Sequence, residues 1–118
     1  CLPFQRQPEK LAALVDRGML VQVTASSLLG EFEKPARRAV ETFLSRGLVH
    51  MVASDMHRAA VTRLPFLARA QARAAELVGE EQASRLFVDT PRAIIEGGNP
   101  DIDPFQSRLG KRRWWPLR

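Results

Sequence analysis

Apolar residues follow two different spacings in the first half of the chain. In residues 8–17 and 34–46 they recur every three or four positions, which is the period of one helix face. Residues 20–25 predict a short strand, and residues 48–53 are a nearly continuous apolar run, as in a strand that is covered on both faces. The order helix, strand, helix, strand, with short connections, predicts βαβ units and a parallel sheet. We therefore expect an α/β fold.

The connecting and C-terminal segments carry turn and helix signals. Residues 26–30 predict a turn that begins with serines and ends at a glycine. Residues 64–78 predict a long helix, and residues 80–88 a shorter one. Thr90 followed by Pro91 predicts the cap and first position of a last short helix. The long helix has a narrow apolar stripe, formed by Leu67, Ala70, Ala74, Leu77 and Val78.

An acid and a histidine follow the predicted strand 48–53. Asp55 and His57 are two positions apart, and residues at that spacing point to the same side of a strand. A carboxylate oxygen and an imidazole nitrogen so placed can both reach one divalent cation at about 2.0–2.2 Å. Functional groups of parallel α/β folds collect at the carboxyl ends of strands, where both residues fall. We predict that they are metal ligands; the alternative is that Asp55 caps the next helix and His57 is an ordinary loop residue.

The net charge of +5 is concentrated at the C-terminus. Residues 1–107 carry 13 basic and 13 acidic side chains, so the body lacks the basic excess of a nucleic-acid-binding domain and no nucleic-acid partner is expected for it. The tail mixes basic residues with two tryptophans, which suits an anionic membrane surface or, through stacking, nucleic acid. The alternative is a solvated chain end. The tail residues expected to make such contacts are Lys111, Arg112, Arg113, Trp114 and Trp115.

The remaining composition places the chain in a reducing compartment. Its single cysteine, Cys1, cannot form an internal disulfide, which is typical of a cytoplasmic protein. No secretory signal is visible, and no run approaches the roughly 18 apolar residues of a membrane span. The chain opens without methionine, so we expect a processed chain or an excerpt. Two strands are too few for a stable α/β domain, which predicts the C-terminal part of something larger.

Two blocks of sequence resemble a known family. Residues 22–32, QVTASSLLGEF, and 46–57, RGLVHMVASDMH, are similar to the "TAGSLLGxFG" and "GLVHFIASDAHN" blocks of bacterial PHP-type (polymerase and histidinol phosphatase) manganese-dependent tyrosine-protein phosphatases of capsule and exopolysaccharide loci. The likeness runs over roughly residues 8–97. It implies a seven-stranded α/β barrel with a metal site at the carboxyl ends of the strands, of which residues 1–98 are the C-terminal part and residues 99–118 a basic tail.

The resemblance also implies roles for individual residues. Asp55 and His57 match the family's metal ligands for Mn²⁺, although the same donors also suit Fe or Zn. Arg63, in an Arg-x-Pro context, matches a phosphate-binding arginine, with Arg58 as second choice; for either, a solvated loop arginine is the alternative. His50, in mid-strand, is interpreted as structural. The family's other ligands, an N-terminal His-x-His pair, acids and the histidine of a "HPER" block, have no counterpart in this chain.

The function implied is hydrolysis of phosphotyrosine on a membrane-associated bacterial tyrosine autokinase that controls capsule synthesis. With only two of the ligands, the isolated 118-residue chain is expected to bind metal weakly and to be inactive. The upstream part of the barrel would be missing from it. The alternative is a non-catalytic interaction fragment that acts through its basic tail.

Overall fold

The computed structural model describes residues 2–31, 34–56 and 66–100, and all structural statements concern these residues. Two short strands lie among helices in the order α1, α2, β1, α3, α4, β2, α5, α6, a π-helical turn and α7. Their bounds are Leu2–Arg6, Pro8–Asp16, Gln22–Thr24, Ala25–Leu29, Lys34–Ser45, Met51–Ala53, Phe66–Val78, Glu80–Ser84, Arg85–Asp89 and Thr90–Ile95.

The two strands form a parallel pair, as the alternation of elements predicted. β1 and β2 are in register, with Thr24 opposite Ala53, and α3 and α4 make the crossover between them. Both strands are shorter than the apolar runs. Ala25 already belongs to α3, and His50 bonds to Val21 before the regular ladder begins. The fold is therefore α/β and mostly helical, with a two-stranded parallel sheet in the described residues.

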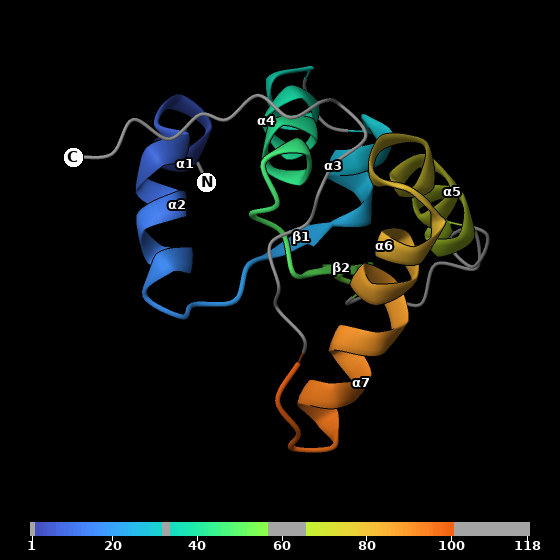
Figure 1. Ribbon diagram of the computed structural model, residues 1–118. Helices are drawn as coiled ribbons and strands as arrows, with labels where there is room; N and C mark the ends of the chain where they lie inside the picture. The colour runs from blue at the N-terminus through green and yellow to red at the C-terminus, as the bar shows by residue number, and fades with distance from the viewer. Residues whose placement is uncertain (1, 32–33, 57–65, 101–118) are drawn as a thin grey trace.

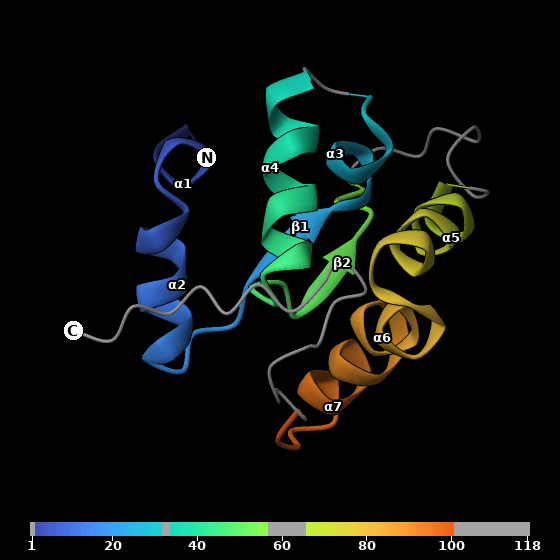
Figure 2. The ribbon, with the colours of Figure 1, turned by 45° about the horizontal axis from the view of Figure 1, so that its top comes forward.

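The helices lie on both sides of this sheet. Figures 1 and 2 show α1 and α2 at one side of the molecule, α5, α6 and α7 at the other, and α4, α3 and the strands between them. α3 packs against both α4 and α5, and the π-helical turn packs against β2. The short helix α3 thus lies between α4 and α5 at the centre.

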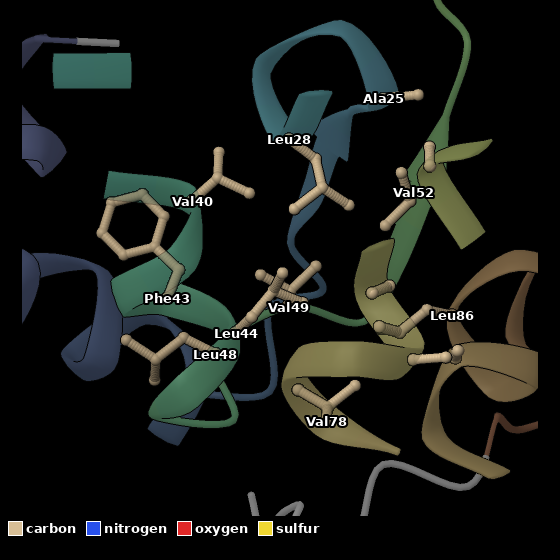
Figure 3. Packing of buried hydrophobic residues seen from close by; sticks show 14 of the residues in the cluster. Ala25, Leu28, Val40, Phe43, Leu44, Leu48, Val49, Val52, Val78 and Leu86 are labelled. Atoms are coloured by element: carbon tan, nitrogen blue, oxygen red, sulfur yellow. The ribbon is translucent and has the colours of Figure 1, made fainter. Parts of the chain in front are cut away.

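The core is formed by apolar side chains from four parts of the chain. Leu28 of α3, Leu44 of α4, Val49 before β2 and Leu86 of the π-helical turn are the largest side chains that are fully buried. Figure 3 shows them gathered between α4 and the C-terminal helices. Burying each contributes about 1.5–3 kcal/mol relative to leaving it in water. Apolar side chains therefore pack against β2 and the segment before it from both α4 and the C-terminal helices.

The predicted turn over residues 26–30 is wrong. Those residues form most of the helix α3, which ends at Gly30 with φ +76°. The serines were interpreted as turn residues, but Leu28 is fully buried, and packing it into the core favours one helical turn. Glycine then ends this helix in the left-handed conformation, as it does in many others.

The predicted short helix after Thr90 is present as α7, but the predicted cap at Thr90 is wrong. α6, the π-helical turn and α7 follow one another without a break, and Asp89 and Thr90 both have helical dihedrals. Thr90 is the first residue of α7 and not its N-cap, and it is buried, at 4% exposed. Pro91 has no N–H to give to a regular helical turn, and the wider π turn before it accommodates that lost hydrogen bond.

The long helix differs in its apolar stripe. α5 buries Phe66 together with Ala70, Ala74 and Val78, whereas Leu67 is 40% exposed. The stripe is shifted by one position at its start, because Phe66 supplies more apolar area than Leu67. Small alanines on the buried face allow α5 to pack closely against α3 and α6.

Candidate functional site

The carboxyl ends of β1 and β2 meet at one edge of the sheet. Thr24 is the last residue of β1 and lies opposite Ala53, the last residue of β2. Ser54 and Asp55 follow at once, and α3 begins directly after Thr24. The predicted ligand Asp55 therefore stands at the edge where parallel folds carry their functional groups, with an exposed side chain.

The backbone at Asp55 is unusual. Its φ is +52°, the one positive φ of a non-glycine residue among those that the structure describes. For an L-residue the left-handed region costs about 1–2 kcal/mol, and aspartate and asparagine tolerate it best. Such residues cluster at sites where the strain serves a function. The conformation distinguishes Asp55 from an ordinary helix cap, whose φ lies in the extended region.

A serine hydroxyl stands on the strand side of this turn. Ser54 Oγ accepts a hydrogen bond from the backbone N–H of Met56 at 3.3 Å, so the bond spans Asp55. Sequence reasoning treated Ser54 only as part of a block of residues. The signal that would have identified it is a serine two positions before a backbone amide that needs a partner, which is the spacing of a side-chain turn.

Hydroxyl groups also line the neighbouring strand end. Thr24 Oγ1 and Ser27 Oγ are 2.8 Å apart and share a hydrogen bond across the start of α3. Ser26 is buried at 9% exposed. The hydroxyls of Thr24 and Ser27 thus make the carboxyl end of β1 polar.

His50 is a structural residue, as predicted. It is 4% exposed, and its Nδ1 accepts the backbone N–H of Val21 at 3.0 Å. Its own backbone N–H donates to the Val21 carbonyl at 2.9 Å. Because Nδ1 is an acceptor, the neutral ring carries its proton on Nε2. Burial lowers the pKa of His50, so the neutral form is favoured.

The other predicted site residues are not placed. His57, Arg58 and Arg63 lie outside the described residues, and so do the tail residues Lys111, Arg112, Arg113, Trp114 and Trp115. Within residues 2–31, 34–56 and 66–100, no three His, Cys, Asp or Glu side chains are grouped to hold a metal ion. The described part of the chain thus places one of the two predicted ligands, Asp55.

A cavity that the sequence did not predict lies beside β1. It measures about 450 Å³ and lies between α1, α2, β1 and α4. The backbone N–H and carbonyl of Val21 point toward His50. Because successive residues of a strand point their backbone groups to opposite edges, the N–H and carbonyl of Gln22 point to the outer edge of β1, beside this cavity. Met19 and Leu20, 48% and 37% exposed, lie at its rim. Its apolar lining includes Leu14, Met19, Leu20, Val23, Val40 and Phe43.

Comparisons with known proteins agree on one family. A family model described as "Capsular polysaccharide synthesis, CpsB/CapC" matches residues 3–96. The tyrosine-protein phosphatase CpsB of Streptococcus pneumoniae is 34% identical over 97 residues, which is 78% of this chain and 40% of that protein. CpsB of Streptococcus agalactiae serotype III is 32% identical over 98 residues, 79% of this chain and 40% of the relative. A putative tyrosine-protein phosphatase CapC of Staphylococcus aureus is 40% identical over 57 residues, which is 48% of this chain and 22% of that protein.

Two further facts bear on what the chain can be. It spans about 40% of the length of the CpsB relatives that it matches. In the part of the chain that the structure describes, no helix is long and apolar enough to cross a membrane.

Proposed function

The chain belongs to the CpsB/CapC family of capsular polysaccharide synthesis, and from this we propose that it is the C-terminal part of a metal-dependent phosphotyrosine-protein phosphatase. The observation that carries the proposal is Asp55, exposed and left-handed at the carboxyl edge of a parallel strand pair. The relatives' names, tyrosine-protein phosphatase CpsB and CapC, support the reaction class.

The architecture proposed for the whole protein is a barrel of parallel strands alternating with helices. The parallel pair with its helical crossover supports this, because such pairs are built from repeated βαβ units. The outer edge of β1 and the apolar cavity beside it support it further, since another parallel strand would pair there and fill that space. Residues 1–98 would then be the last part of the barrel, and residues 99–118 an appended tail.

The residues proposed to hold the metal are Asp55 and His57. A carboxylate and a neutral imidazole fit Mn²⁺, and equally Fe or Zn, so manganese is proposed on family grounds. When bound, the metal supplies positive charge that polarises the phosphoryl group. Arg63, or Arg58 in its place, would bind the phosphoryl oxygens through its planar guanidinium. Asp55 would bind the metal through its carboxylate. The end of β1, lined by the hydroxyls of Thr24 and Ser27, would border the substrate.

The partner proposed is a phosphorylated bacterial tyrosine kinase of capsule synthesis, with the reaction in the cytoplasm. Membership of a capsular polysaccharide synthesis family supports a role in that process. The basic tail, with its two tryptophans, would bring the phosphatase to the anionic membrane surface where such a kinase is anchored.

The decisive experiment uses the full-length protein with manganese and p-nitrophenyl phosphate. Asp55→Ala and His57→Ala should each lower hydrolysis at least about 100-fold, because loss of a ligand removes several kcal/mol of charge stabilisation. Asp16→Asn, an exposed acid at the end of α2, is the matched control and should retain full activity. The isolated 118-residue chain should show no appreciable turnover.

Two results would contradict the proposal. Retained manganese-dependent activity in both Asp55→Ala and His57→Ala would refute the ligand assignment. Turnover by the isolated chain, abolished by Asp55→Ala, would show that the 118-residue chain needs no upstream ligands.

A further inference from the structure

The turn after β2 is held from both sides. On the strand side, Val52 is 4% exposed and pairs in register with Val23. On the far side, the N–H of Met56 donates to Ser54 Oγ at 3.3 Å. Asp55 lies between these two anchors with φ +52°. The Ser54 hydroxyl therefore closes the turn around Asp55.

The hydrogen bond offsets part of the cost of the unusual backbone. The left-handed backbone is unfavourable for an L-residue, and the exposed hydrogen bond from Met56 N–H to Ser54 Oγ favours the turn that contains it. Without the hydroxyl, Met56 N–H would lose this partner and Asp55 could relax toward negative φ. The direction of a side chain follows its backbone dihedrals, so relaxation would turn the Asp55 carboxylate away from its present direction.

We propose that Ser54 is a positioning residue, whose hydroxyl holds the left-handed turn that presents the Asp55 carboxylate to the metal. This rests on the proposed role of Asp55 as a ligand and goes beyond it by naming what orients that ligand. Groups that fix a ligand's orientation typically change metal affinity 10- to 100-fold when removed. Ser54 makes its contact through the backbone amide of Met56 and touches no metal or substrate in this role.

Three serine variants of the full-length protein test the proposal. Ser54→Ala removes the acceptor, and Ser54→Thr keeps a hydroxyl that can accept from the same N–H. Ser45→Ala is the matched control, because Ser45 Oγ also bonds to backbone, donating to the Thr42 carbonyl at 2.8 Å, but at the end of α4. The readouts are the Mn²⁺ dissociation constant by calorimetry, the thermal midpoint of the metal-free protein, and activity titrated with Mn²⁺.

Ser54→Ala should bind Mn²⁺ about 10-fold more weakly. Ser54→Thr and Ser45→Ala should bind like wild type. Both alanine variants should melt close to wild type without metal, and the activity of Ser54→Ala should recover as Mn²⁺ is raised. A purely structural defect would lower the midpoint and would not be rescued by added metal.

The proposal is overturned if Ser54→Ala binds Mn²⁺ like wild type, or if Ser54→Thr fails to restore binding. Measuring Mn²⁺ binding of Asp55→Ala in the same experiment separates the role of Ser54 from the proposed role of Asp55 as a metal ligand. If Asp55→Ala binds Mn²⁺ normally, the ligand assignment fails. If Asp55→Ala loses binding while Ser54→Ala keeps it, the ligand assignment stands and only the role of Ser54 is refuted.

Discussion

His50 fastens the two strands at their amino ends. Its ring accepts the Val21 N–H and its backbone donates to the Val21 carbonyl, so one residue holds both groups of Val21. Protonation at Nδ1 would convert this acceptor into a donor facing another donor. The histidine is therefore useful in the fold only while it is neutral.

The need for a neutral His50 makes the stability of the fold depend on pH in one direction. Burial lowers the pKa of His50 below its ordinary value of 6.5, so below pH 6.5 the unfolded chain binds the proton more readily than the folded one. The contribution to stability is complete above pH 6.5 and is lost as the pH falls through the folded-state pKa. We expect the free energy of unfolding to fall over this window, by no more than about 1.4 kcal/mol per pH unit from this group.

Urea unfolding of wild type and His50→Gln at several pH values between 7.5 and 5 measures this effect. Glutamine keeps an acceptor but does not titrate, so its stability should be the flatter of the two in this window. Equal slopes for the two proteins would contradict the assignment of the pH dependence to His50.

Single residues show which parts of the site sequence could predict. Asp55 is identifiable because it follows an apolar run and carries a chemically distinctive side chain. The left-handed backbone of Asp55 cannot be identified from sequence, because its φ is set by the surrounding turn and by the hydroxyl of Ser54. The structural role of His50 was predictable from its place among apolar neighbours, but the Val21 partner, 29 positions away, follows only from strand pairing.

At the scale of elements, the junction between α3 and α4 combines a helix end with an ion pair. Gly30 ends α3 at φ +76°, and a Cβ on it would lie 3.0 Å from Cδ of Arg37. Arg37 Nε donates to Glu41 Oε1 at 3.0 Å, and Arg73 of α5 reaches the same oxygen at 2.9 Å. The hydrogen bond from Arg73, together with that from Arg37, lowers the pKa of Glu41. Arg37 and Arg73 thus share one acceptor oxygen where α4 meets α5.

Two glycine substitutions separate backbone strain from this contact. Gly18 has φ +86°, and a Cβ on it would meet nothing within 4 Å, so Gly18→Ala should cost about 1 kcal/mol of unfolding free energy from strain alone. Gly30→Ala should cost about 0.5 kcal/mol more, because the displaced Arg37 gives up an exposed helical ion pair. Denaturant unfolding of both variants measures the difference. A smaller loss for Gly30→Ala than for Gly18→Ala would contradict the proposed crowding.

The elements that periodicity predicted best are those with a polar outer face. α2 and α4 match residues 8–17 and 34–46 to within one residue, because their one-sided apolar patterns are long. α3 was missed since it is a single buried turn with no polar face to mark it. The π-helical turn was missed because nothing local distinguishes it from an α-helix with a proline ahead.

At the scale of the whole molecule, the charge asymmetry supports one more prediction. The body is neutral and the last 11 residues are strongly basic, so removing residues 105–118 should remove binding to anionic vesicles while leaving the body intact. Sedimentation with phosphatidylglycerol vesicles should pellet the 118-residue chain and not the shortened one, with zwitterionic vesicles as control. Equal pelleting of the two chains would refute a membrane role for the tail.

The arrangement of β1 and β2 also has a consequence for biosynthesis. A parallel partner lies beyond the whole crossover, so β1 is synthesised before the residues of β2 have been joined to the chain. At about 5–20 residues per second, this interval lasts roughly 2–6 seconds. Throughout it, β1 and the apolar residues Met19 and Leu20 have neither His50 nor β2 to cover them. These apolar residues can therefore be covered by α4 and β2 only after the whole crossover has been synthesised.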